Sequence, residues 1–195
     1  MTTAYIALGA NLASWAGSPA ETLVAAAERL EELGQVTARS SLFSTEPVGF
    51  ADQPRFVNAV AALETSLSAR ALLDGLLAIE REFGRDRSTG IANGPRSLDL
   101  DLLLLGDLVI HAAGMEIPHP RLAERAFVLV PLNEIASNLL VVTQRMTVKE
   151  LLYGLRRGLP TESDAVLPFQ YPQWNPGPCG HGGVRADSPD PHGDR

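Results

Sequence analysis

The sequence has almost no cysteine and almost no lysine. Cys179 is the single cysteine among 195 residues, so no internal disulfide can form, and no Cys/His spacing resembles a zinc site. Lys149 is the single lysine, so arginine supplies the other basic residues. No apolar run approaches the roughly 20 residues of a membrane helix, because Asp99 and Asp101 interrupt the longest candidate, residues 98–105. These absences exclude disulfide scaffolds, zinc proteins and membrane-spanning proteins.

The chain is acidic overall, with 16 Lys and Arg against 23 Asp and Glu and a formal net charge of −7. A protein that coats a nucleic-acid backbone needs a dense basic surface, so nucleic acid is not an expected partner. The N-terminus has no basic segment before its first apolar run and does not resemble a signal peptide, which predicts a cytoplasmic protein. We expect a monomer or weak homodimer that acts on small molecules.

Composition divides the chain into a patterned part, residues 1–158, and a tail, residues 159–195. Proline and glycine together make up 11 of the last 35 residues, and such a segment buries too little apolar surface to offset its ordering entropy. We therefore expect one folded domain followed by a disordered tail, and expect deletion after Gly158 to leave most activity intact. The alternative is that the apolar stretch from Ala165 to Trp174 docks as an extended arm.

Hydrophobic periodicity and capping signals predict that strands alternate with helices in the patterned part. Strands are expected at 5–8, 36–44, 56–65 and 98–105, a short fifth strand is expected to begin at 109–110, and helices are expected at 18–34, 68–84, 126–136 and 147–158. The order strand, helix, strand, strand, helix, strand is the split β-α-β pattern. It predicts an α+β fold, a ferredoxin-like α/β sandwich with a mainly antiparallel sheet and helices packed on it.

Two aspartates lie in the strand expected at 98–105. Because side chains alternate along a strand, Asp99 and Asp101 share one face, with Cα atoms about 7 Å apart at roughly 3.3 Å per residue. Like charges this close raise each other's pKa unless a cation lies between them. Magnesium is such a cation, since it binds one or two carboxylates and completes its shell with water and substrate phosphates. A solvated strand face with two chance aspartates is the competing interpretation.

Arginines near this pair favour the metal interpretation. Arg85 and Arg87 lie in the preceding loop, at 85–94, and Arg96 stands three residues before Asp99. Guanidinium groups match phosphate oxygens in pairs, so arginines around two carboxylates indicate a metal–polyphosphate complex. The chain has neither the P-loop motif nor Gly-x-Gly-x-x-Gly, which excludes P-loop phosphoryl chemistry and gives no support to a dinucleotide fold.

Polar residues in two other places are candidates for the same site. His119 lies between two prolines, which makes a partly exposed position plausible, and Arg121 and Arg125 follow it. Asn58 is polar within an apolar strand, where an amide must find partners. It either pairs within the sheet or recognises the edge of a heterocycle.

Six segments in order carry a resemblance to a known family: 7–12, 45–54, 56–58, 79–87, 94–101 and 118–132. The most specific is Gly94-Pro-Arg-Ser-Leu-Asp-Leu-Asp101. The sequence resembles 6-hydroxymethyl-7,8-dihydropterin pyrophosphokinase, a folate-pathway family. The resemblance implies transfer of the terminal pyrophosphate of ATP to the hydroxymethyl group of a reduced pterin, with AMP as the second product.

The resemblance also implies a role for each matching residue. Asp99 and Asp101 would hold two magnesium ions that bridge ATP and the attacking hydroxymethyl group, and Arg85 and Arg96 would act in catalysis with them. ATP contacts are implied for Glu80, Arg85, Arg87, Arg96, His119 and Arg125. Pterin contacts are implied for the backbone of Thr45 and Val48, for Asn58 at the ring edge, and for Phe56 and Phe127 on the ring faces. The loops at 45–54 and 85–94 would close over the substrates.

Two alternatives stay open at this point. A nucleotide-sugar transferase could use the Asp-x-Asp pair as its metal site, and it would not need Asn58 or Phe127. A non-catalytic ferredoxin-like binding module would merely expose the two aspartates, and it would not turn over ATP.

Overall fold

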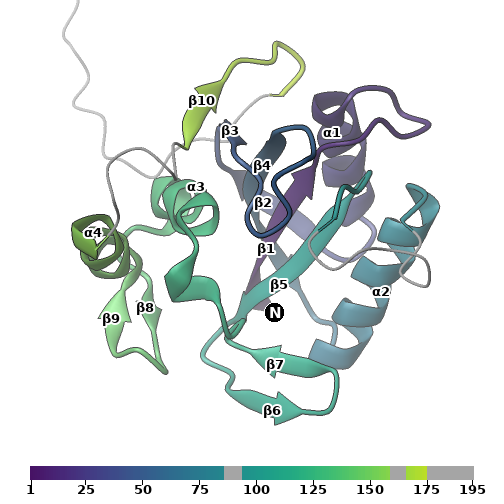
Figure 1. Ribbon diagram of the computed structural model, residues 1–195. Coiled ribbons are helices and arrows are strands. Elements are labelled where there is room, and N and C mark those ends of the chain that lie inside the picture. Colours follow the sequence, from purple (N-terminus) through teal and green to yellow (C-terminus); the bar gives the residue numbers. More distant parts are fainter. Residues whose placement is uncertain (86–93, 159–165, 175–195) are drawn as a thin grey trace, which may run out of the picture.

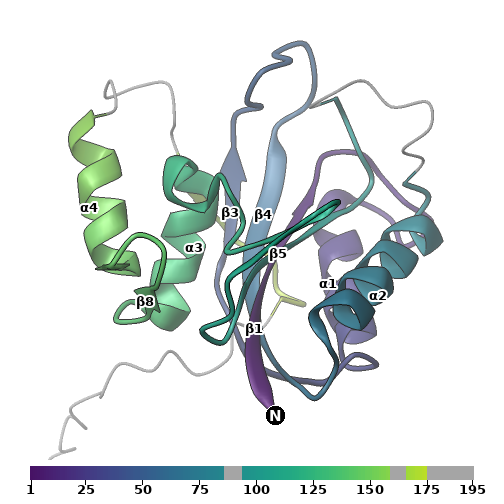
Figure 2. The ribbon, with the colours of Figure 1, turned by 90° about the horizontal axis from the view of Figure 1, so that it is seen from below.

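An antiparallel sheet forms the centre of the fold, and helices cover both of its faces (Figures 1 and 2). The computed structural model describes residues 1–85, 94–158 and 166–174. Strand β1 (Thr2–Ala10) lies inside the sheet, between β4 (Phe56–Thr65) and β5 (Asp99–Leu105). The strand order is β10-β3-β4-β1-β5, with a sixth strand that also pairs with β4, which confirms the expected α+β fold with a mainly antiparallel sheet.

The single strand expected at 36–44 is wrong, because the structure has two strands there. These are β2 (Gln35–Arg39) and β3 (Leu42–Thr45), and both pair with β4. Ser40 lies at the break and is fully buried. Its backbone N–H donates to the Val60 carbonyl at 2.9 Å, and its Oγ accepts the Val60 N–H at 3.0 Å. The serine side chain thus takes the place of a backbone partner and interrupts the strand.

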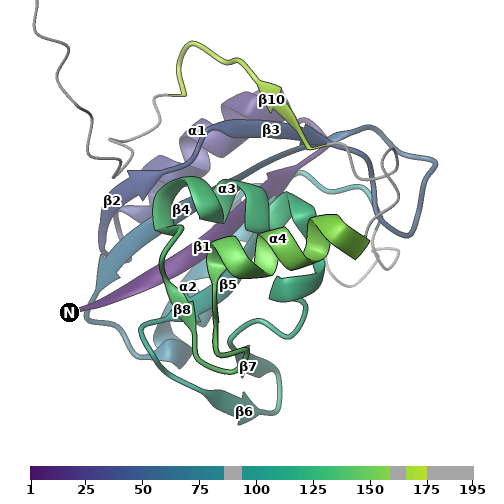
Figure 3. The same cartoon turned by 90° about the vertical axis from the view of Figure 1, so that its left-hand side faces the viewer.

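Helices pack in pairs on the two faces of the sheet (Figure 2). Helices α1 (Pro19–Leu30) and α2 (Ala69–Glu82) enclose one apolar core against β1, β4 and β5. Helices α3 (Ala126–Ala136) and α4 (Val148–Gly158) enclose a second core on the opposite face, as Figure 3 shows from that side. The expected capping box of α1 is present, since Ser18 and Glu21 bond to each other's backbone N–H. Among the described residues, no helix is long and apolar enough to cross a membrane.

Short elements complete the fold. Strands β6 (Ile110–Ala112) and β7 (Met115–Ile117) form a hairpin beyond β5, which confirms the short strand expected to begin at 109–110. A short 3-10 helix, η1 (Leu122–Glu124), precedes α3, and the hairpin of β8 (Leu140–Val141) and β9 (Met146–Thr147) precedes α4. After β7 the polypeptide returns to the sheet, because the His119 N–H donates to the Leu103 carbonyl of β5 at 2.9 Å.

The expectation of disorder is wrong for residues 166–174 of the tail. Strand β10 (Leu167–Phe169) pairs antiparallel with β3, and Trp174 is buried, so the docked arm that the sequence left as an alternative is present. Composition averaged over the whole tail conceals this short apolar stretch, and the edge of β3 supplies its backbone partners. The other tail residues, 159–165 and 175–195, lie outside the described residues.

Candidate functional site

The candidate site lies across three neighbouring strands, where the carboxyl end of β1 meets β4 and β5. Gly9 on β1 is opposite Asn58 on one side and Asp99 on the other. A Cβ atom at Gly9 would lie 2.8 Å from Asn58 Oδ1, which is closer than carbon and oxygen can approach without a shift. The absence of a side chain at Gly9 therefore lets the Asn58 amide lie over β1. Gly9 was not predicted as a site residue, although it belongs to the matching segment 7–12.

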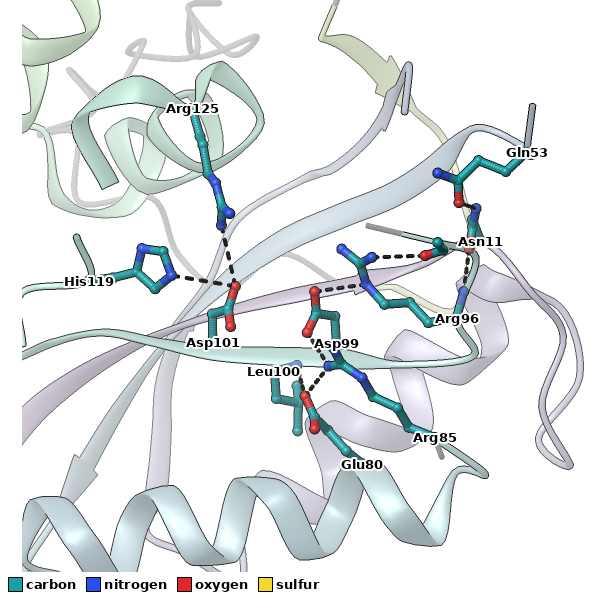
Figure 4. Close-up of polar contacts among 11 residues, drawn as sticks. Asn11, Gln53, Glu80, Arg85, Arg96, Asp99, Leu100, Asp101, His119 and Arg125 are labelled. Atoms are coloured by element: carbon teal, nitrogen blue, oxygen red, sulfur yellow. Dashed lines mark hydrogen bonds and ion pairs between the residues drawn. The ribbon is translucent and has the colours of Figure 1, made fainter. Parts of the chain in front are cut away.

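Asp99 is held by two arginines (Figure 4). Arg96 Nε lies 2.8 Å from Asp99 Oδ2, and Arg85 pairs with Asp99 Oδ1. Arg85 also pairs with Glu80, whose side chain is 1 % exposed and accepts the Leu100 N–H at 2.8 Å. Glu80 thus lies behind Arg85 and Asp99 and joins α2 to β5. It does not line the hollow described below.

Asp101 faces a second group of cations (Figure 4). Its Oδ2 atom lies 3.5 Å from Arg125 Nη1 and 3.9 Å from His119 Nε2. Burial, and then the charge of Asp99, raise the pKa of Asp101. Burial also lowers the pKa of His119, against the attraction of Asp101. Burial and the neighbouring Asp99 thus both disfavour the charged form of Asp101, while His119 and Arg125 favour it.

These groups converge on one hollow of about 240 Å³. All but two of the predicted site residues line it: Thr45, Val48, Phe56, Asn58, Arg85, Arg96, Asp99, Asp101, His119, Arg125 and Phe127. The exceptions are Glu80, which is buried behind the wall, and Arg87, which lies outside the described residues. Residues from five separate segments of the chain thus form one pocket.

One side of the hollow has an amide and two phenyl rings. Asn58 Nδ2 donates to Thr45 Oγ1 at 2.7 Å, and both side chains are buried. The guanidinium carbon of Arg96 lies 4.7 Å from the centre of the Phe56 ring, and that of Arg125 lies 5.5 Å from the centre of the Phe127 ring. This side offers flat apolar surfaces and a fixed hydrogen-bonding group, which suit a planar heterocycle.

Asn11 connects the two sides of the hollow, and the sequence analysis missed its role. Its amide nitrogen donates to Gln53 Oε1 and to the Pro54 carbonyl, both at 3.0 Å, and its Oδ1 accepts the Arg96 N–H at 2.8 Å (Figure 4). It therefore ties the end of the 45–54 loop to the arginine segment. The available signal was a polar residue directly after an apolar strand, within the matching segment 7–12.

A second hollow of about 390 Å³ adjoins the first and shares Asp101 and His119 with it. Helix α2, strand β5 and the β6–β7 hairpin form its walls, and it is lined by apolar side chains such as Leu73, Leu77 and Ile117 together with the polar Asp101, Glu116 and His119. Leu73 was predicted as helix core because its spacing from the other leucines is helical. Periodicity cannot distinguish a leucine that packs in a core from one that lines a cavity.

The donor set at the aspartates suits a hard cation. Within the described residues, no group of three or more His, Cys, Asp or Glu side chains is arranged to hold a metal ion. Asp99 and Asp101 offer carboxylate oxygens on one face of β5, and magnesium needs only one or two protein carboxylates when phosphates supply further ligands. The residues therefore fit magnesium that binds together with a phosphate substrate.

Fold and site together define a class of protein. An α+β domain with paired carboxylates, surrounding arginines and an adjacent planar-ring pocket is the arrangement expected of an enzyme that handles a polyphosphate. A model of the family 7,8-dihydro-6-hydroxymethylpterin-pyrophosphokinase (HPPK) matches residues 5–137. The chain belongs to this family.

Curated relatives carry the same activity in their names. The 2-amino-4-hydroxy-6-hydroxymethyldihydropteridine pyrophosphokinase of Pseudomonas aeruginosa is 47% identical over 137 residues, which are 69% of this chain and 81% of the relative. The enzyme of the same name from Haemophilus influenzae is 46% identical over 154 residues, 78% of this chain and 92% of the relative. The expected enzyme class and its place in folate biosynthesis are thereby confirmed, and the two alternatives are not favoured.

The fold also matches solved structures. The crystal structure of Plasmodium falciparum HPPK-DHPS wild type with SDX-DHP gives a TM-score of 0.59 at 14% identity and covers 79% of this chain. This chain spans 43% of that longer chain. At this identity the likeness concerns the fold alone, and it agrees with the predicted antiparallel sheet with helices packed on it.

Proposed function

We propose that this chain transfers the terminal pyrophosphate of ATP to the hydroxymethyl group of 6-hydroxymethyl-7,8-dihydropterin, with AMP as the second product. One observation carries the proposal: Asp99 and Asp101, their arginines, and the pair Asn58 and Thr45 all line one hollow. A pyrophosphate donor and a pterin acceptor must meet at such a junction, because transfer needs both reactants at a fixed separation. Family membership supplies the identity of the two substrates.

The pterin would occupy the side with the amide and the phenyl rings. Asn58 has two amide hydrogens, one directed to Thr45, and a carbonyl oxygen, so it can pair with the donor and acceptor edge of a pterin. Phe56 and Phe127 now lie beside guanidinium groups. A pterin ring stacked on their faces would displace these groups toward the phosphates, so the binding of one substrate would help to position the other.

ATP would extend from the aspartates into the second hollow. Arg85, Arg96, His119 and Arg125 line the region around Asp99 and Asp101, where the phosphates would lie. The second hollow, which shares Asp101 and His119, would take the base. Glu80, implied by the resemblance to lie near the nucleotide, would instead act from behind the wall by fixing Arg85.

Asp99 and Asp101 would hold magnesium, two ions by the family resemblance. Bound there with ATP, magnesium supplies charge neutralisation for the transferred pyrophosphoryl group. The protein's part is to orient the two carboxylates through Arg85, Arg96 and Arg125, and to bring the pterin oxygen into line with the leaving phosphate. No covalent step by a protein side chain is required.

The test is AMP formation from ATP, magnesium and the reduced pterin alcohol. We expect wild-type protein to release AMP, and Asp99→Asn and Asp101→Asn to lower turnover on the order of 10²–10³-fold, because each removes a carboxylate that would hold the magnesium bound with the reacting phosphates. Asp107→Asn is the matched control, since Asp107 is exposed in the turn after β5. Absence of AMP with wild type, or equal turnover in Asp99→Asn, would refute the proposal.

A monomer or weak homodimer in the cytoplasm, expected from the sequence, stays a prediction of this proposal.

A further inference from the structure

The docked part of the tail, residues 166–174, which we term the arm, extends the sheet at the strand that borders the pterin side. In β10, Leu167 lies opposite Ser44 and Phe169 opposite Leu42 of β3 (Figure 1). The other edge of β3 pairs with β4, where Thr45 lies opposite Phe56. The arm therefore covers the outer edge of the strand that ends at Thr45, the hydrogen-bond partner of Asn58.

Trp174 anchors the far end of the arm. Its side chain is buried in the core that α1 and α2 enclose, with a residue exposure of 5%. The indole Nε1–H donates to the Ser40 carbonyl at 2.7 Å, and the guanidinium carbon of Arg39 lies 5.3 Å from the ring centre. Ser40 is itself bonded to Val60 of β4. Trp174 thus binds the backbone at the break between β2 and β3, two residues before β3 begins.

The near end of the arm reaches the pterin side directly. Val166 lines a small hollow of about 90 Å³ together with Thr45, Val48 and Phe127, three of the residues implied to contact the pterin. The phosphate side has a different support. Asp99 lies on β5 at the opposite edge of the sheet, where it pairs with Arg85, which follows α2 and pairs in turn with Glu80 of α2.

We propose that the arm positions the pterin-binding wall, with Trp174 as its anchor, so that the arm governs pterin affinity and leaves ATP affinity nearly unchanged. The inference rests on the proposed pyrophosphokinase function. Without the anchor, β3 keeps its pairing to β4 but loses the strand on its outer edge, and Thr45 and the following loop lose a fixed support. If the arm has this role, deletion after Gly158 lowers pyrophosphokinase activity, contrary to the expectation from the sequence that such a deletion leaves most activity intact.

The experiment compares Michaelis constants of full-length Trp174→Ala, Trp174→Phe and wild type. We expect Trp174→Ala to raise KM for the pterin alcohol on the order of tenfold, because displaced positioning groups weaken productive binding. KM for ATP should stay within about twofold of wild type. Trp174→Phe keeps an aromatic ring and loses only the N–H to Ser40, so its pterin KM should rise about threefold, the loss expected for one hydrogen bond. Tyr153→Ala, at an exposed aromatic residue on α4, is the matched control and should change neither constant.

Each outcome decides for or against the role of the arm. A selective rise in the pterin KM supports the positioning role, whereas unchanged constants, or equal rises for both substrates, refute it. If Trp174→Ala does not fold, the same comparison on Trp174→Phe distinguishes these outcomes. Wild-type protein that releases no AMP would refute the proposed function itself, while an active wild type with unaffected variants would refute only the role of the arm.

Discussion

Glu80 is the buried acid of the site, and we predict that Glu80→Gln destabilises the fold without weakening ATP binding directly. The side chain is 1% exposed at the end of α2, where it pairs with Arg85 and accepts the Leu100 N–H at 2.8 Å. Arg85 in turn pairs with Asp99. Glu80 therefore joins a helix to a central strand of the site and orients one of the arginines that would bind phosphate.

The expected decrease in the free energy of unfolding depends on which contacts of Glu80 a glutamine can still make. Removing one partner of a buried ion pair costs roughly 3–5 kcal/mol when the other charge is left uncompensated. Here Arg85 keeps Asp99, and the glutamine oxygen can still accept the Leu100 N–H. The loss is then nearer the roughly 1.5–3 kcal/mol of one hydrogen bond to a charged group, and we expect about 2 kcal/mol.

Urea unfolding measures this loss of stability. Turnover and KM for ATP then show whether Glu80 acts through Arg85 or contacts the nucleotide. With a slope of about 2 kcal/mol per M urea, the midpoint should fall by about 1 M. Glu82→Gln is the matched control, because Glu82 lies on the same helix but forms an exposed pair with Arg29, for which we expect less than about 1 kcal/mol. In Glu80→Gln, turnover should fall with KM for ATP within about twofold, because only the orientation of Arg85 changes. An unchanged midpoint with a raised KM for ATP would refute the reasoning, since it would place Glu80 against the nucleotide.

Two further predictions concern close packing and pH. Gly9→Ala introduces a Cβ 2.8 Å from Asn58 Oδ1, so the Asn58 amide must move. The KM for the pterin should therefore rise on the order of tenfold. Gly154→Ala is the control, because Gly154 has open space around it, and it should leave the pterin KM unchanged. An unaltered pterin KM in Gly9→Ala would contradict the role of the amide. Hydrogen bonds from Ser18 lower the pKa of Glu21, so its stabilisation is present at neutral pH and is lost as pH falls through the lowered folded-state pKa. The difference in unfolding free energy between wild type and Glu21→Gln should therefore shrink as the pH falls below the usual range of a glutamate, and a constant difference would contradict this assignment.

The part of the site predicted from the sequence is the part encoded by local periodicity. Asp99 and Asp101 alternate with leucines, so a strand places both on one face, whatever it pairs with. Glu80 is different, because its burial depends on α2 packing against β5, and nothing within the helix distinguishes it from the exposed Glu82. The resemblance implies only that Glu80 lies near the nucleotide, which stays a prediction, while its contacts with Arg85 and Leu100 required the structure.

The arm shows a second limit of reasoning from the sequence. Its composition is that of a segment that does not fold alone, and its order comes from partners distant in the chain. The indole of Trp174 bonds to Ser40, 134 positions away, and β10 pairs with the edge of β3. The same serine splits the expected strand at 36–44, because a hydroxyl that replaces a backbone partner leaves no periodic signal. Long-range pairing, rather than local propensity, decided both features.

The end of β1 explains how two substrates can be kept at one separation. Gly9 lies between Asn58, on the pterin side, and Asp99, on the phosphate side, within a continuous hydrogen-bonded sheet. Two residues later, Asn11 bonds both Pro54 and Arg96, so the loop at 45–54 and the arginine segment share one buried amide. Strands within a sheet shift little relative to one another, whereas loops move readily. In the proposed reaction, the sheet would therefore fix the distance between acceptor and donor, and movement of the loop at 45–54 would exclude water without altering that distance.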